Sequence, residues 1–85
     1  MRIIICDDDP IFLDEMSGRI QAYFEKQSSN VTIKTVLDGN ELLQMLGNYP
    51  ADAVFLDIDM PGINGFDTAG AVKKQYPDCI LVFCS

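Results

Sequence analysis

Four short apolar runs alternate with three amphipathic stretches along this chain of 85 residues. The runs at 2–6, 53–56 and 79–84 are almost continuously apolar, which is typical of strands buried on both faces of a sheet. The run at 31–37 alternates instead, with Lys34 on the face opposite to the apolar side chains. That alternation predicts a strand at the edge of the sheet.

The first two amphipathic stretches have recognisable helix starts. Pro10 follows Asp9, a candidate N-cap, and proline is well tolerated at the first helical position because the amide that it lacks has no partner there. Asp38 with Glu41 three residues later resembles a capping box, and the helix that follows should end near Gly47. The predicted inner face of the first helix consists of Leu13, Met16, Ile20, Tyr23 and Phe24.

The third stretch predicts a helix that is broken at Pro77 and has Lys73 and Lys74 on its outer face. Its predicted inner face consists of Phe66, Ala69, Val72 and Tyr76. The resulting order βαβαβαβ, with short connections, favours an α/β fold with a doubly wound parallel sheet. No repeat or linker interrupts the pattern, so we expect a single domain over residues 1–85.

Carboxylates follow two of the predicted strands. Asp7–Asp9 come directly after the first strand, and Asp57 and Asp59 come directly after the third. All strands of a parallel sheet end at the same edge, where ligands of open α/β sheets bind, so these two groups should converge. Carboxylate oxygens suit Mg²⁺, and Asp57 is the candidate for a reacting residue. Asp9 is more simply explained as a helix cap.

Composition narrows the function further. A net charge of −7 with six Lys and Arg argues against direct binding of nucleic acid or of an anionic membrane surface. The chain has no histidine, which argues against a zinc site, and no apolar segment approaches the roughly 20 residues that span a bilayer. Cys6, Cys79 and Cys84 are an odd number without CxxC spacing, which indicates reduced structural thiols and a cytoplasmic protein.

Two other functions use the same residues. Asp57-x-Asp59 resembles the nucleophile strand of haloacid-dehalogenase-like phosphatases, Mg²⁺-dependent enzymes that pass through an aspartyl phosphate. In that family Thr or Val stands two residues after the second Asp, whereas this chain has Pro61, and the nucleophile lies near the start of the domain. A module that only binds a partner, without chemistry, is the third possibility.

Three segments together carry a more specific resemblance: ICDDDP at 5–10, FLDIDMPGINGFD at 55–67 and ILVFCS at 80–85. Over its whole length the chain resembles the receiver (phosphoacceptor) domain of bacterial two-component response regulators. The resemblance implies a flavodoxin-like fold with strand order 2-1-3-4. It also implies a domain that assists its own phosphorylation by a sensor histidine kinase, rather than a separate enzyme.

The resemblance also assigns roles to residues. Asp7 and Asp8 would hold Mg²⁺ together with Asp57, which would accept the phosphoryl group. Asp59 would supply a backbone carbonyl to the metal, and Ser85 would be the hydroxyl that senses the phosphate. The residues around Asp57 look most like those of regulators with a LytTR-type DNA-binding output, which implies an output in transcription.

Receiver domains usually continue with a fourth helix, a fifth strand that ends in a lysine, and a fifth helix. Residues 1–85 do not include these elements, so the resemblance implies a receiver domain that is incomplete at its C-terminal side, either truncated or a piece of a longer regulator. We therefore expect exposed apolar surface on the last strand and self-association or swapping of elements. We also expect Mg²⁺ binding with poor phosphorylation.

Overall fold

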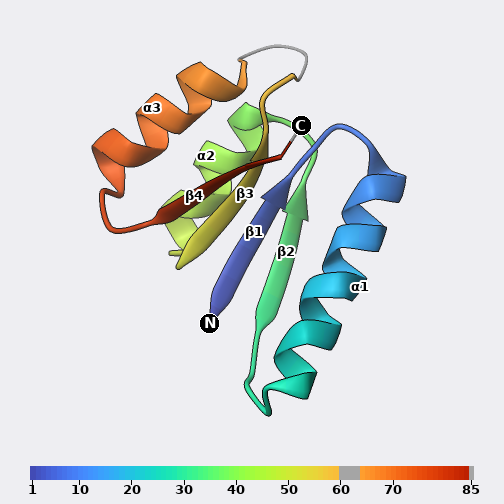
Figure 1. Ribbon diagram of the computed structural model, residues 1–85. Helices are drawn as coiled ribbons and strands as arrows, with labels where there is room; N and C mark the ends of the chain where they lie inside the picture. Colours follow the sequence, from blue (N-terminus) through green and yellow to red (C-terminus); the bar gives the residue numbers. More distant parts are fainter. Residues whose placement is uncertain (60–63, 85) are drawn as a thin grey trace.

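The protein is a four-stranded parallel sheet with helices on both faces (Figure 1). The computed structural model describes residues 1–59 and 64–84. Its strands are β1 (Arg2–Cys6), β2 (Thr32–Val36), β3 (Ala53–Asp57) and β4 (Ile80–Cys84), in the spatial order β2-β1-β3-β4. All three strand pairs are parallel. The predicted fold class, the strand order 2-1-3-4 and the edge position of β2 are confirmed.

One helix covers one face of the sheet and two cover the other. Helix α1 (Pro10–Lys26) packs on the β1–β2 side of its face, and α2 (Gly39–Asn48) and α3 (Gly65–Gln75) lie side by side on the opposite face (Figure 1). In the parts of the chain that the structure describes, no helix is long and apolar enough to cross a membrane.

The sheet separates two hydrophobic clusters. The larger one lies between the sheet and helices α2 and α3, and its buried members are Ile4, Cys6, Val36, Leu42, Leu46, Val54, Leu56, Ala69, Val72 and Cys79. The smaller one lies under α1, and its buried members are Ile3, Ile5, Leu13, Ile20 and Ala53. Because β1 contributes alternate side chains to both clusters, its apolar run has no polar face.

Side-chain caps fix where the helices begin. The carboxylate of Asp9 accepts a hydrogen bond from the Ile11 amide at 3.0 Å, and that of Asp38 accepts one from the Glu41 amide at 2.8 Å. Both predicted N-caps are therefore confirmed. The cap of α3 is Asn64, whose Oδ1 accepts from the Asp67 amide at 2.9 Å, a role that the sequence analysis did not assign.

Two aromatic residues were wrongly predicted to face the core. Tyr23 is 59% exposed, whereas the other four members of the predicted α1 face are buried or half-buried. Phe66 is 64% exposed and packs against Phe83, with 5.7 Å between the ring centroids. The buried stripe of α3 is Gly65, Thr68, Ala69 and Val72. The helix is thus turned so that a glycine, not Phe66, faces the sheet.

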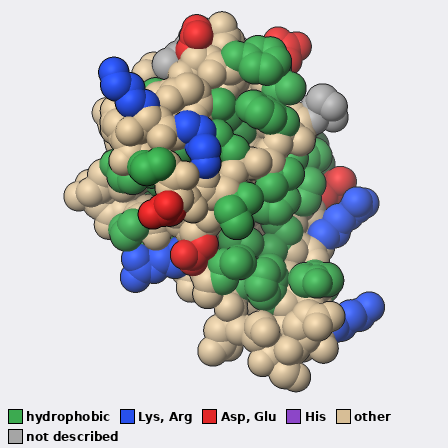
Figure 2. All heavy atoms as spheres, turned by 60° about the vertical axis from the view of Figure 1, so that its left-hand side comes forward, with side chains coloured by type: hydrophobic (Ala, Val, Ile, Leu, Met, Phe, Trp, Pro, Cys, Tyr) green, Lys and Arg blue, Asp and Glu red, His purple; other side chains and the backbone are tan. Residues whose placement is uncertain are grey.

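The β4 side of the molecule has uncovered apolar surface, as expected. Ile80, Val82 and Phe83 are 57%, 37% and 46% exposed. Figure 2 brings the α3–β4 side forward and shows hydrophobic side chains gathered in a band along it. Val82 also lines an almost entirely apolar groove of about 330 Å³ between α1 and the sheet, together with Phe55 and Tyr23.

The two kinds of apolar position predict different responses to truncation. We expect Leu42→Ala, in the fully buried centre of the larger cluster, to lower the free energy of unfolding by about 2–5 kcal/mol. Phe66→Ala should cost no more than the roughly 0.5–1.5 kcal/mol of an aromatic pair, because its ring is already largely in water. Urea denaturation followed by circular dichroism measures both. Equal losses would place Phe66 in the core.

Candidate metal centre

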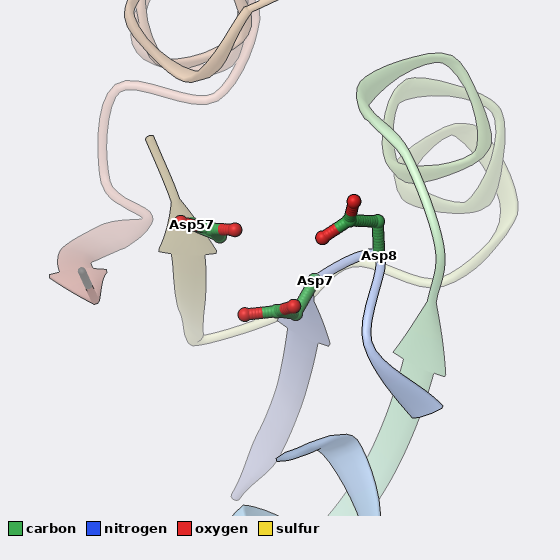
Figure 3. Close-up of side chains that lie close together, drawn as sticks. All are labelled: Asp7, Asp8 and Asp57. Atoms are coloured by element: carbon green, nitrogen blue, oxygen red, sulfur yellow. The ribbon is translucent and has the colours of Figure 1, made fainter. Parts of the chain in front are cut away.

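The register of β1 and β3 brings carboxylates from distant parts of the sequence together. Cys6 pairs with Leu56, so the next residues, Asp7 and Asp57, leave the sheet side by side. One carboxylate oxygen from each of Asp7, Asp8 and Asp57 lies within 4.8 Å of the others. Figure 3 shows the three side chains pointing toward a common space at the carboxyl ends of the two strands. The predicted convergence is confirmed.

Asp7 is the buried member of the cluster, with 8% of its surface exposed. Its backbone amide donates to the Val36 carbonyl at 3.2 Å, and its Oδ1 accepts from the Asp9 amide at 2.9 Å. Burial raises the pKa of the Asp7 carboxyl above its ordinary value, and the charges of Asp57 and Asp8 raise it further, while the hydrogen bond from Asp9 acts in the opposite direction. The fold therefore places the Asp7 carboxyl group where its charged form is electrostatically unfavourable.

Asp57 is half-buried at the end of β3, and the turn that follows orients its carboxylate. The backbone amide of Asp59 donates to Oδ1 of Asp57 at 3.2 Å. The Asp59 side chain is exposed, and the three-carboxylate group does not include it. Asp8 is exposed as well, so the cluster opens to solvent on its side. A small ion or an anionic group can therefore reach Asp57 from outside.

The negative charge of this edge is also felt by two thiols. The pKa of Cys6 is raised to about 12, first by burial and then by nearby carboxylates that include Asp7 and Asp57. Cys84 pairs with Asp57 across β3 and β4, and burial together with Asp7 and Asp57 raises its pKa. Thiols with raised pKa values stay protonated and unreactive at neutral pH. No disulfide joins the three cysteines in the described part of the chain, and their reduced state stays a prediction.

The remaining residues considered for the site lie away from the three carboxylates or outside the residues that the structure describes. Asp9 acts as the α1 cap. Lys73 donates through Nζ to the carbonyls of Pro77 and Cys79 at 3.0 and 2.8 Å, so it is held before the start of β4, at the end of that strand remote from Cys84 and Asp57. Ser85 and residues 60–63 lie outside the described residues.

The first turn of α3 contacts the backbone that carries Asp57. The amide of Gly65 donates to the Ile58 carbonyl at 3.0 Å. A Cβ atom added to Gly65 would lie 2.5 Å from the Ile58 Cα and 2.6 Å from the Asp57 carbonyl oxygen, so the approach requires glycine. This close approach depends on tertiary packing, and the sequence analysis did not predict it.

Three carboxylates held this close repel one another when they are charged, so a positive counter-charge would stabilise the group. Their donor set contains only oxygen, which matches Mg²⁺ and does not match zinc. The arrangement therefore fits a hard divalent cation beside a half-buried carboxylate that is able to act as a nucleophile.

Comparison with known proteins agrees with this chemistry. The family model described as "Response regulator receiver domain" matches residues 3–85. The chain belongs to this family, whose members are signalling domains that accept a phosphoryl group in two-component systems. The match does not favour the phosphatase or the chemically inert module as alternatives.

Curated relatives include a sensory transduction protein and a response regulator. The chain is 27% identical over 85 residues to the sensory transduction protein LytT of Oceanobacillus iheyensis, covering 98% of this chain and 33% of that protein. It is 33% identical over 81 residues to the response regulator SaeR of Staphylococcus aureus, covering 95% and 32%. The chain thus spans about a third of the length of these relatives.

Solved structures show the same fold. The response regulator TrrA of Thermotoga maritima in complex with Mg²⁺-BeF superposes with a TM-score of 0.85 at 30% identity, covering 96% of this chain and 66% of that one. TrrA in complex with the histidine kinase ThkA gives a TM-score of 0.83 at the same identity and coverage. A two-component transcriptional regulator of Clostridium phytofermentans gives 0.86 at 28% identity, covering 98% and 64%.

The raised pKa of Asp7 predicts how stability depends on pH when no divalent cation is present. Because the folded-state pKa lies above the unfolded value, the contribution of Asp7 to stability is fully present below the ordinary pKa of 3.8 and is lost as pH rises through the folded-state pKa. Asp7→Asn removes this loss. We expect the variant to melt at a higher temperature than the wild type at pH 7, with the difference shrinking toward pH 4.

Thermal melts in chelator across this pH range measure the effect. Asp14→Asn, an exposed acid on α1, is the control and should follow the wild type. A lower melting temperature for Asp7→Asn at pH 7 would contradict the assignment of Asp7 as an electrostatically unfavourable carboxylate.

Proposed function

We propose that this chain is a phosphoacceptor switch in which Asp57 receives a phosphoryl group in the presence of Mg²⁺. The observation that carries the proposal is the group of three carboxylates at the carboxyl ends of β1 and β3, each with one oxygen within 4.8 Å of an oxygen of the others. Family membership supports the same reaction.

The side chains of Asp7, Asp8 and Asp57 and the backbone carbonyl of Asp59 would hold the ion. Bound Mg²⁺ supplies the positive charge that lowers repulsion between the carboxylates and an incoming phosphoryl donor. Asp59 also has a second role, because its backbone amide donates to Oδ1 of Asp57 at 3.2 Å. The other carboxylate oxygen of Asp57, Oδ2, does not accept this hydrogen bond.

The transfer itself requires positioning more than elaborate chemistry. A carboxylate oxygen of Asp57 attacks the phosphorus of a phosphohistidine, the P–N bond breaks, and the imidazole leaves as the acyl phosphate forms. The new dianion would then recruit the Ser85 hydroxyl, which follows β4 directly, and shift the chain between two states. The domain accepts one group per molecule and does not act on a succession of substrates.

The donor and the output are proposed from relatives. A sensor histidine kinase as donor is supported by the complex of TrrA with ThkA. An output in transcription is supported by the likeness to a two-component transcriptional regulator of Clostridium phytofermentans. The LytTR type is proposed from the residues around Asp57 and from the similarity to LytT. A cytoplasmic location fits the reduced thiols.

Phosphorylation by a small donor tests the site. After incubation with acetyl phosphate and Mg²⁺, we expect intact-mass spectrometry to show the addition of one phosphoryl group, and peptide mapping to place it on Asp57. Labelling should be slow and incomplete, because Lys73 is held at the other end of β4 and is not available to the phosphoryl group. Chelation of Mg²⁺ should abolish it.

Asp57→Asn should remove the label, and Asp14→Asn should retain it as a control for surface charge. A label on another residue, or hydrolysis of the donor with no adduct on the protein, would contradict the proposed role of Asp57. Fast stoichiometric labelling would show that the lysine supplied by other receiver domains is dispensable here.

We also propose that the 85-residue chain self-associates through β4. This strand lies at the edge of the sheet and carries no charged side chain, whereas the opposite edge strand, β2, carries Lys34, a residue that discourages edge pairing. Pairing of two β4 edges, or an exchange of β4 between copies, would cover Ile80, Val82 and Phe83.

Light scattering over a concentration series measures this association. We expect a mass above that of one chain, falling to one chain for Val82→Lys, which places a charge on the apolar strand. Leu37→Lys, at an exposed position after β2, is the matched control and should behave as the wild type. A mass of one chain for the wild type at every concentration would refute the proposal.

A further inference from the structure

The start of α3 contains a set of polar contacts that the metal cluster does not use. Thr68 is hydrogen-bonded to Asn64, and Gly65 is hydrogen-bonded to Ile58, the residue after Asp57. Thr68 has none of its surface exposed, although it is polar and lies on a helix of only 11 residues. We call Ile58, Asn64, Gly65 and Thr68 the α3 clasp.

Thr68 donates twice to the same acceptor. Its backbone amide reaches the Asn64 carbonyl oxygen at 3.0 Å, as in any helix, and its Oγ1 hydroxyl reaches the same oxygen at 2.9 Å. The Asn64–Gly65 peptide is planar, so fixing its oxygen also fixes the direction of its N–H. That N–H belongs to Gly65 and donates to the Ile58 carbonyl at 3.0 Å.

The effect of the clasp reaches the carboxylate of Asp57 through the backbone. The Ile58 carbonyl belongs to the peptide whose nitrogen is that of Asp59, and this Asp59 amide donates to Oδ1 of Asp57 at 3.2 Å. One planar peptide group thus accepts from Gly65 at one end and donates to Asp57 at the other. The Gly65 backbone also lies against Asp57 and Ile58 too closely for a side chain.

We infer that the buried Thr68 hydroxyl is a positioning group for the Asp57 carboxylate and thereby sets the affinity of the proposed site for Mg²⁺. The hydrogen bond of Thr68 orients the Asn64–Gly65 peptide at the start of α3. That peptide orients the Ile58–Asp59 peptide, and the amide of the second peptide holds Oδ1 of Asp57. The inference rests on the proposed function for its metal, but the chain of contacts exists without one. Groups that orient metal ligands typically affect affinity although they never touch the ion.

Three variants separate positioning from simple stability. Thr68→Val removes the hydroxyl and keeps the shape, and Thr68→Ser keeps the hydroxyl and removes a methyl group. Ile20→Val, in the cluster under α1, is a control that loosens packing away from the site. Mg²⁺ affinity is measured by calorimetry at a temperature where circular dichroism shows each variant folded. Amide hydrogen exchange of Asp59 and Gly65 is measured in chelator.

We expect Thr68→Val to weaken Mg²⁺ binding by about tenfold and to speed exchange of the Gly65 and Asp59 amides. Thr68→Ser should restore both toward the wild type, and Ile20→Val should change neither. Equal Mg²⁺ affinity in Thr68→Val and Ile20→Val would overturn the inference, as would unchanged exchange of the two amides. Absence of Mg²⁺ binding in the wild type would instead refute the proposed function, and the exchange measurement would still decide whether the clasp positions Asp57.

A pair of glycine variants checks the same contact from the other side. Gly65→Ala places a methyl group against the Asp57 and Ile58 backbone and should weaken Mg²⁺ binding at least as much as Thr68→Val. Gly70→Ala, on the same helix with nothing within 4 Å of the added atom, should leave affinity unchanged. Equal affinities for the two variants would show that the approach of α3 does not matter to the site.

Discussion

Repulsion among three carboxylates at one edge of the sheet is the constraint on which the rest of the structure depends. One carboxylate oxygen each of Asp7, Asp8 and Asp57 lies within 4.8 Å of the others. Burial adds to the cost of a charge on Asp7. The charges remain together because the parallel pairing of β1 with β3 fixes the carboxyl ends of the two strands next to each other. An ion that neutralises them recovers the electrostatic cost, which makes the site selective for cations before any ligand geometry is considered.

Register decides whether this cluster exists. Neighbouring strands lie about 4.8 Å apart, and a slip of one residue moves a side chain about 3.3 Å along the strand and turns it to the opposite face. The pairing of Cys6 with Leu56 is therefore as important to the site as the carboxylates themselves. The register is enforced by apolar side chains on both faces, since Val54 and Leu56 enter one cluster and Ala53 enters the other.

The third helix is held to the site by backbone contacts more than by large side chains. Its buried stripe contains Gly65 and Thr68, and its largest apolar residue, Phe66, is left outside. This orientation of α3 leaves Phe66 largely in water but brings the start of the helix against the Asp57 backbone. The cap provided by Asn64 then satisfies an amide of the first turn, so the close approach leaves fewer polar groups unpaired.

The sequence by itself determined the order of elements, the edge position of β2, the caps at Asp9 and Asp38, and the convergence of Asp7, Asp8 and Asp57. These features depend on local propensity, on period and on the rule that parallel strands end at one edge. Only the tertiary structure decided that Phe66 and Tyr23 lie outside the core, that Asn64 caps α3, and that Thr68 is buried beside the site. In α3, helical spacing allows more than one inward face, and the face that is used places Gly65 against the backbone of Asp57 and Ile58, an approach that no local pattern predicts.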